Sequence, residues 1–264
     1  MVNFIYLIVN AFILSYSFFM GVAVSRRNFR LSRPLALAGL AVLFSQCAIT
    51  FFPEFEYALF GFNDYAYIRW WGLAGAFLTL GASFDSMNPG VRNLLILITI
   101  VISIIVAIYW DISVAENGYY FNEAGWQDGV CAQSTGYTSA PAACATLLKH
   151  FGVAASEKEM AGYCLTDRRG TIPIYIARGL KLKLDHDAYK VIVARAGWDE
   201  LNDIPAPFIT GLYHPESAAH TVTVIEKKPD EITFADPLKR KKITVKKDDF
   251  IKDWDGLVIY AVKR

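Results

Sequence analysis

Four long apolar stretches occupy most of the first 110 residues of the chain. Each is bounded by charged residues, proline or glycine, and aromatic side chains lie near several of the ends. A bilayer core of about 30 Å is crossed by roughly 20 apolar residues in helical conformation, and aromatic residues favour its interfaces. We therefore predict four membrane-spanning helices, at about 3–24, 34–52, 67–84 and 93–110.

After about residue 133 the apolar residues follow a shorter helical pattern. One helix face carries apolar side chains at the i, i+3, i+4, i+7 spacing, namely Cys144, Leu147, Leu148 and Phe151. This spacing predicts a helix over 140–151, and Gly152 is a typical helix stop.

Two more helices are predicted to follow. Ser156 and Glu159 have the three-residue spacing of a capping box, which predicts a helix start at Ser156. Thr171 and Pro173 indicate the start of another helix that runs to about Arg178, because proline is favoured in the first helical turn.

Strand patterns dominate the remainder of the chain. The β-branched and aromatic runs are LKLKL, YKVIV, PFITGLY, HTVTVIE, EITFADP, KKITV and LVIYAV, and DDFIKDW is predicted as a short helix before the last strand. Helices followed by an antiparallel sheet predict an α+β fold of the papain-like, two-layer kind. We expect a linker over 111–126 and a peptidase-like domain over 127–264, behind a four-helix transmembrane region over 1–110.

Composition and charge agree with this division. The chain is 54% hydrophobic, and residues 1–110 contain six of its 26 basic and four of its 25 acidic residues. The net charge is only +1, so the composition gives no indication of nucleic-acid binding. The first apolar stretch lacks a basic leading segment and a small-residue cleavage site, so we predict a retained helix and not a signal peptide.

The arginine distribution predicts the orientation. Arg26, Arg27, Arg30 and Arg33 lie between the first two predicted spans, which places that loop in the cytoplasm. Four crossings then place residues 111–264 outside, so we expect a multi-pass protein of the bacterial cytoplasmic membrane with a periplasmic or cell-surface domain. The lipid bilayer is its expected partner on this basis.

The segment around residue 139 has the features of a nucleophile position. Ser139 precedes Pro141 at the predicted helix start, where the helix dipole favours a reactive anion. Taken alone, Ser139 is better explained as a helix N-cap.

Two distant residues change that interpretation. His220 begins the strand HTVTVIE and Asp236 ends the next strand, so an antiparallel hairpin would bring them together. A histidine oriented by a carboxylate is the base that a nucleophile requires. Gln133, six residues before Ser139, can supply a side-chain donor for an oxyanion.

Together these motifs resemble the bacteriocin-processing family of papain-like cysteine peptidases, the double-glycine leader peptidases. Its members carry a glutamine six residues before Cys-Gly-Pro-Ala, then a histidine that starts an apolar strand, then Asp-Pro. The corresponding segments here are Gln133, Ser139 to Ala142, His220 and Asp236-Pro237. The resemblance covers roughly residues 127–264 and implies a thiol protease with a Cys-His-Asp catalytic triad, a peptide or leader-peptide substrate, and no cofactor.

Two departures from the family pattern stand at the nucleophile. Ala140 replaces glycine, and Ser139 replaces cysteine. Three interpretations of Ser139 remain open: an engineered substitution that silences the enzyme, a natural loss that leaves a peptide-binding pseudopeptidase, or a working serine variant. The intact Gln133, His220 and Asp236 favour the first. Exporter-fused leader peptidases act inside the cell, which is opposite to the predicted topology.

The remaining cysteines give no alternative nucleophile. Cys131 lies in a predicted loop and Cys144 on an apolar helix face. Cys144 and Cys164 fall on the inward faces of successive predicted helices. They could form a disulfide or remain two free thiols, and the spacing does not decide between these alternatives. No Cys/His spacing indicates zinc.

Overall fold

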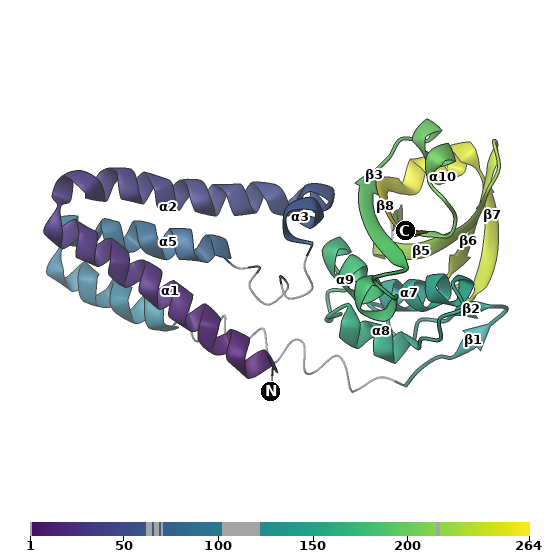
Figure 1. Ribbon diagram of the computed structural model, residues 1–264, viewed down its shortest axis with the longest axis horizontal. Coiled ribbons are helices and arrows are strands. Elements are labelled where there is room, and N and C mark those ends of the chain that lie inside the picture. Colours follow the sequence, from purple (N-terminus) through teal and green to yellow (C-terminus); the bar gives the residue numbers. More distant parts are fainter. Residues whose placement is uncertain (1, 62–64, 66–68, 70, 102–121, 215–216) are drawn as a thin grey trace. The chain divides into compact units, whose positions relative to one another are not determined.

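The computed structural model describes residues 2–61, 65, 69, 71–101, 122–214 and 217–264. Backbone contacts divide the chain into two compact units (Figure 1). The first consists of Met1–Phe52 with Asp64–Ile112, and the second of Pro53–Asn63 with Ser113–Arg264. Residues 53–63, which follow the second predicted span, therefore belong to the same unit as the domain expected over 127–264.

The first unit is helical. Its elements are α1 (Val2–Arg27), α2 (Phe29–Thr50), α5 (Trp71–Ala82), the short 3-10 helix η1 (Phe84–Ser86) and a helix over Pro89–Val101. Ile8–Arg27 and Phe29–Thr50 are long and apolar enough to cross a membrane. The described parts of the third and fourth predicted spans are shorter, and the remainder of both, including 102–110, lies outside the described residues. Four spans were predicted, and the described residues contain two candidate spans.

Close helix packing in this unit depends on glycine. A Cβ atom added at Gly39 of α2 would lie 2.5 Å from the carbonyl oxygen of Gly75 in α5. Backbone contact between helices through small residues is typical of membrane proteins, where side-chain burial gives no hydrophobic gain. Outward-facing side chains are large and apolar, such as Phe12 of α1 and Phe44 of α2, which are 67% and 66% exposed. This surface suits lipid better than water.

The second unit places three helices before its sheet. They are α7 (Ser139–His150), α8 (Glu157–Tyr163) and α9 (Pro173–Lys183). The hydroxyl of Ser156 accepts a hydrogen bond from the Glu159 N–H at 3.2 Å, as the capping pattern predicts. The Glu159 carboxylate pairs with Lys183 at 2.6 Å, so it bridges two helices.

One strand prediction was wrong. The segment LKLKL, residues 180–184, forms the last turn of α9 and its cap, and the helix runs beyond Arg178 to Lys183. Its alternating pattern also fits a strand, but Leu180 and Leu184 continue the buried helical stripe that begins at Ile176 and Ala177. Tertiary burial of that stripe decides between the two patterns.

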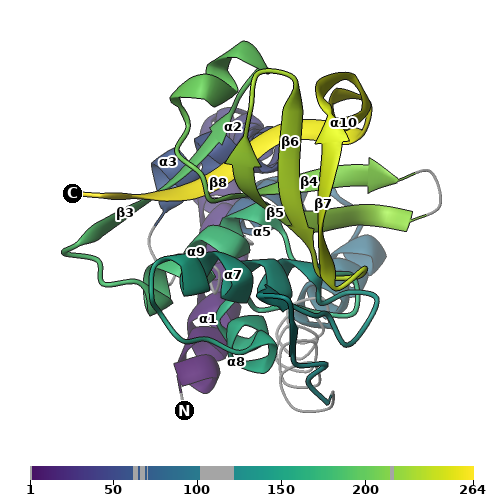
Figure 2. The same cartoon turned by 90° about the vertical axis from the view of Figure 1, so that its right-hand side faces the viewer.

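Six antiparallel strands form the main sheet, in the order β3-β8-β4-β5-β6-β7. The strands are β3 (Tyr189–Arg195), β4 (Phe208–His214), β5 (Ser217–Lys227), β6 (Glu231–Asp236), β7 (Lys241–Lys246) and β8 (Trp254–Lys263). Helices α7, α8 and α9 lie together on one side of this sheet, and α10 (Lys247–Asp253) lies on the other (Figures 1 and 2). A small hairpin of β1 (Trp126–Gln127) and β2 (Val130–Cys131) precedes α7.

Two apolar cores fill this α+β unit. Leu147 of α7, Leu180 of α9 and Ile259 of β8 belong to the core between the helices and the sheet. Phe208, Val224 and Phe250 belong to the core on the opposite face, which α10 and the 3-10 helix η2 (Asp199–Asp203) cover. Alternate residues of the central strands therefore face different cores, as the two-residue period of a strand requires.

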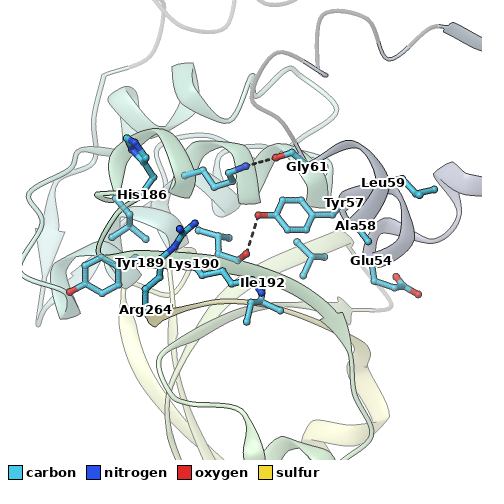
Figure 3. Close-up of a pocket in the computed structure, with 14 residues that line it drawn as sticks. Glu54, Tyr57, Ala58, Leu59, Gly61, His186, Tyr189, Lys190, Ile192 and Arg264 are labelled. Atoms are coloured by element: carbon cyan, nitrogen blue, oxygen red, sulfur yellow. Dashed lines mark hydrogen bonds between the residues drawn. The ribbon is translucent and has the colours of Figure 1, made fainter.

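Helix α3 (Pro53–Phe60) packs against the outer edge of the sheet (Figure 3). The Tyr57 hydroxyl donates to the Val191 carbonyl of edge strand β3 at 3.0 Å, and burial raises the pKa of Tyr57 to about 12. Glu54 pairs with Arg195 at 3.4 Å. These contacts border a cavity of about 660 Å³ and cover a strand edge that would otherwise expose unpaired backbone groups.

Candidate active site

The predicted nucleophile position, residue 139, lies at the start of α7. Thr138 is the N-cap and Ser139 the first helical residue, so the prediction that Ser139 is the N-cap was wrong by one position. The Thr138 hydroxyl makes no capping hydrogen bond to α7; it accepts from the Thr135 N–H at 3.1 Å and closes the preceding turn. Ser139 is thereby held in the first turn, where backbone N–H groups have no helical partner.

The Ser139 hydroxyl contacts the sheet next to the histidine. Its Oγ accepts from the Thr221 backbone N–H at 3.3 Å, and Thr221 directly follows His220 in β5. In the described part of the chain, Ser139 and His220 form no side-chain hydrogen bond with each other. Ser139 is buried, with 8% of its surface exposed.

His220 and Asp236 lie side by side, as the hairpin topology predicts. Thr223 pairs with Ala235 across β5 and β6, so the end of β6 reaches the start of β5. His220 Nε2 lies 2.8 Å from Asp236 Oδ1. This contact leaves Nδ1 as the ring nitrogen that is available to a nucleophile.

Asp236 is held as a carboxylate by its surroundings. Burial alone would raise its pKa, but the hydrogen bond and charge of His220 and two backbone N–H groups lower the pKa below its ordinary value. The same Oδ1 atom accepts from Leu238 N at 2.9 Å and from Lys239 N at 3.1 Å. An ionised acceptor favours the tautomer that carries its proton on Nε2, which leaves Nδ1 as the acceptor nitrogen.

Gln133 is tied to the loop that follows Asp236. Its backbone N–H donates to the Pro237 carbonyl at 3.0 Å. Its side-chain Nε2 donates one hydrogen to the Thr135 carbonyl at 2.8 Å, and an amide nitrogen has a second. Gln133 Oε1 is buried with no partner among the described residues.

Glu157 is a buried residue at this site that no sequence pattern indicated. It is 1% exposed, and its Oε1 accepts from Ser134 N at 2.7 Å and from Ser134 Oγ at 2.9 Å. This contact holds the segment between Gln133 and Ser139 against α8. Its partner is 23 residues away in the sequence, so local patterns carry no signal for it.

Three buried cysteines lie near α7 and α8. Cys144 Sγ and Cys164 Sγ are 3.8 Å apart, as free thiols in contact. Burial raises the pKa of Cys131 to about 12 and raises that of Cys144 well above its ordinary value. Such thiols are poor nucleophiles. In the residues that the structure describes, no three His, Cys, Asp or Glu side chains cluster as a metal site.

The chain is similar to several known proteins. The model of the Peptidase C39 family matches residues 128–264. An uncharacterized protein of Methanothermobacter marburgensis is 35% identical over 130 residues, which are 49% of this chain and 85% of the relative. Another, of Methanothermobacter thermautotrophicus, is 30% identical over 135 residues, with shares of 49% and 85%.

Solved structures of peptidase domains are also similar to the second unit. The peptidase domain of Streptococcus ComA, a bifunctional ABC transporter involved in a quorum-sensing pathway, is 22% identical, covers 51% of this chain and 98% of its own, and has a TM-score of 0.46. A double-glycine motif protease from an AMS/PCAT transporter, solved with a leader peptide, is 16% identical, covers 51% and 89%, and has a TM-score of 0.45.

Proposed function

Because the chain belongs to the Peptidase C39 family, we propose that residues 127–264 form the catalytic domain of a membrane-anchored cysteine endopeptidase. The observation that carries this proposal is the His220–Asp236 contact of 2.8 Å, one residue from the N–H that contacts Ser139 Oγ. A base, its orienting carboxylate and a helix-start nucleophile position are what acyl transfer requires. The substrate is a peptide or leader peptide.

Each residue has a defined role in the proposed reaction. A thiolate at position 139 attacks the scissile carbonyl carbon, and the carbonyl electron pair moves to oxygen. Two groups donate to that oxyanion: the second hydrogen of the Gln133 side-chain Nε2 and the backbone N–H of residue 139. The oxyanion then collapses, and the C–N bond breaks as His220 gives its Nδ1 proton to the leaving amine, which leaves a thioester. Water attacks this thioester while His220 takes a proton from it, and the thiolate at residue 139 leaves. Asp236 orients the ring throughout.

The serine in this chain weakens the first step. A hydroxyl is far less acidic than a thiol, and an imidazole poised for a thiolate pair activates it poorly. The Ser139 hydroxyl also accepts a hydrogen bond from Thr221. We therefore expect the Ser139 form to be inactive, and the active enzyme to carry cysteine at this position.

Membrane anchoring is the second element of the proposal. It is supported by the two apolar helices Ile8–Arg27 and Phe29–Thr50 and by their exposed apolar side chains. The arginine-rich segment 26–33 favours a cytoplasmic loop between these two helices, and an even number of crossings then places the peptidase domain outside. Protease digestion of intact spheroplasts would cleave residues 122–264 in this orientation, whereas protection of the domain would reverse the orientation.

A second function, a peptide-binding pseudopeptidase, is favoured by Ser139 itself. A domain that still binds peptides but lacks the cysteine thiol at residue 139 would hold a peptide for a membrane partner without cleaving it. Cleavage of a peptide library by the Ser139→Cys chain separates the two functions. Cleavage that disappears on adding His220→Ala supports the peptidase. Peptide binding without cleavage in the Ser139→Cys chain supports the pseudopeptidase.

A further inference from the structure

A small cavity lies next to the nucleophile position. Its volume is about 180 Å³, enough for one side chain but not for a folded segment. Thr221 lines it, and the N–H of that residue donates to Ser139 Oγ. Thr171 and Pro173 at the start of α9 line another side. The cavity is therefore positioned to receive a side chain of a substrate bound at residue 139.

Most of the lining is apolar. Ile176, Ile209, Leu257 and Ile259 contribute aliphatic side chains from α9, β4 and β8. Such walls favour the methylene stem of a bound side chain, because contact removes apolar surface from water.

Asp255 is the one carboxyl group that lines this cavity within the described residues. Its Oδ1 accepts from Leu257 N at 2.9 Å. Burial raises the pKa of Asp255, although hydrogen bonds with Leu257 and Gly211 and the charge of Arg195 oppose that rise. Arg195 donates instead to the backbone carbonyl of Asp255 at 2.8 Å and pairs with Glu54.

The fold makes specific room for this carboxyl group. The register of β4 and β8 shifts between Thr210, which pairs with Val258, and Leu212, which pairs with Trp254. Asp255 therefore lies opposite the irregularity at Gly211. A Cβ atom at Gly211 would be 2.5 Å from Asp255 Oδ2, so a larger residue there would displace the carboxylate.

We propose that this cavity is a substrate side-chain subsite and that Asp255 selects a residue with an aliphatic stem and a cationic end, lysine or arginine. An uncharged side chain of the same length would cover the carboxylate without compensating its lost hydration. A cationic end supplies a charge-assisted hydrogen bond at the same place. This inference rests on the proposed peptidase function and adds a substrate class to it.

The test uses the full-length Ser139→Cys chain and matched peptides. Lysine and norleucine, which share an aliphatic stem, are exchanged at each of four positions on either side of the cleaved bond. At one position we expect kcat/KM to be roughly 10- to 100-fold higher with lysine. Asp255→Asn should reduce this ratio to within about twofold, because the lysine peptide loses its charged partner and the norleucine peptide no longer covers an uncompensated charge.

Controls separate the possible failures. Asparagine keeps an acceptor for Leu257 N, and continued cleavage of the norleucine peptide shows that the variant is folded. Asp248→Asn, at an exposed position on α10, removes the same charge away from the cavity and should keep the full lysine preference. Cleavage with no lysine preference at any position, or a preference that survives Asp255→Asn, overturns the subsite alone. No cleavage of any peptide overturns the peptidase proposal, and the subsite falls with it.

Discussion

Replacing Asp236 with alanine would remove the acceptor that holds His220 in place. Asp236 is 4% exposed, and its Oδ1 accepts from His220, Leu238 and Lys239. A hydrogen bond to a charged group contributes roughly 1.5–3 kcal/mol, and the two backbone bonds are partly replaceable by water because Leu238 is exposed. We expect the local stability of the β5–β6 hairpin to fall by about 2–4 kcal/mol.

Asp236→Asn is the matched comparison. Asparagine keeps one side-chain oxygen in nearly the same place but loses the negative charge, so it retains neutral hydrogen bonds. A charge-assisted bond is about twice as strong as a neutral one, so we expect a loss below roughly 1.5 kcal/mol. The order of stability should be Asp, then Asn, then Ala.

Amide hydrogen exchange of the hairpin peptides measures this effect locally, which avoids assuming that a two-unit chain unfolds in one step. A loss of 2–4 kcal/mol corresponds to exchange about 30- to 900-fold faster in residues 217–236 of the alanine variant. Exchange within twofold of the parent would show that the His220–Asp236 contact does not hold the hairpin. If exchange in the asparagine variant is as fast as in the alanine variant, an uncharged oxygen at this place does not hold the hairpin and the negative charge is required.

Three further predictions concern other parts of the chain. The pKa of Asp236 is lower in the folded state than in the unfolded state. Its contribution to stability is therefore complete above the unfolded pKa of about 3.9 and is lost as the pH falls through the lower folded pKa. Hydrogen exchange measured along an acid titration should show this loss in the parent and not in Asp236→Asn. Glu157→Ala leaves the Ser134 N–H without its acceptor, so we expect it to lower kcat/KM of the Ser139→Cys enzyme at least tenfold. Glu157→Gln keeps an acceptor oxygen and should retain most of the activity. An equal loss in both variants would contradict a hydrogen-bonding role. Gly39→Leu should lower the melting temperature of the first unit in detergent, because α2 and α5 pack closely at this glycine. Gly90→Leu should not, because a Cβ atom there meets only Asn88 Oδ1, at 3.7 Å. Equal melting temperatures of the two variants would argue against backbone packing at Gly39.

The parts of the fold set by local pattern could be predicted from the sequence. Ser156 caps α8 because its hydroxyl reaches an N–H three residues away. The placement of His220 near Asp236 followed from hairpin topology, since both lie at the same end of adjacent antiparallel strands. The segment 180–184 was ambiguous because its alternation fits a strand, and only burial against the sheet selects the helix.

Contacts between distant segments could not be predicted in this way. Tyr57 donates to Val191, 134 residues along the chain, and nothing in the pattern around either residue indicates that pairing. The contact of Glu157 with Ser134 is similar, because a glutamate in a first helical turn is equally well explained by the helix dipole. The N-cap at Thr138 also depends on a turn that closes through Thr135.

The proposed site is tested most directly by the reactivity of a thiol at position 139. In the Ser139→Cys chain with Cys47→Ala, the remaining thiols at 131, 144 and 164 are at most 2% exposed, against 8% for residue 139, so a small alkylating reagent should report mainly on residue 139. We predict rapid alkylation that persists below pH 7, because His220 and the helix start stabilise the thiolate. Adding His220→Ala should shift the midpoint of alkylation upward, toward the free-thiol value of about 8.5. A midpoint near 8.5 both with and without His220 would contradict the proposed active site.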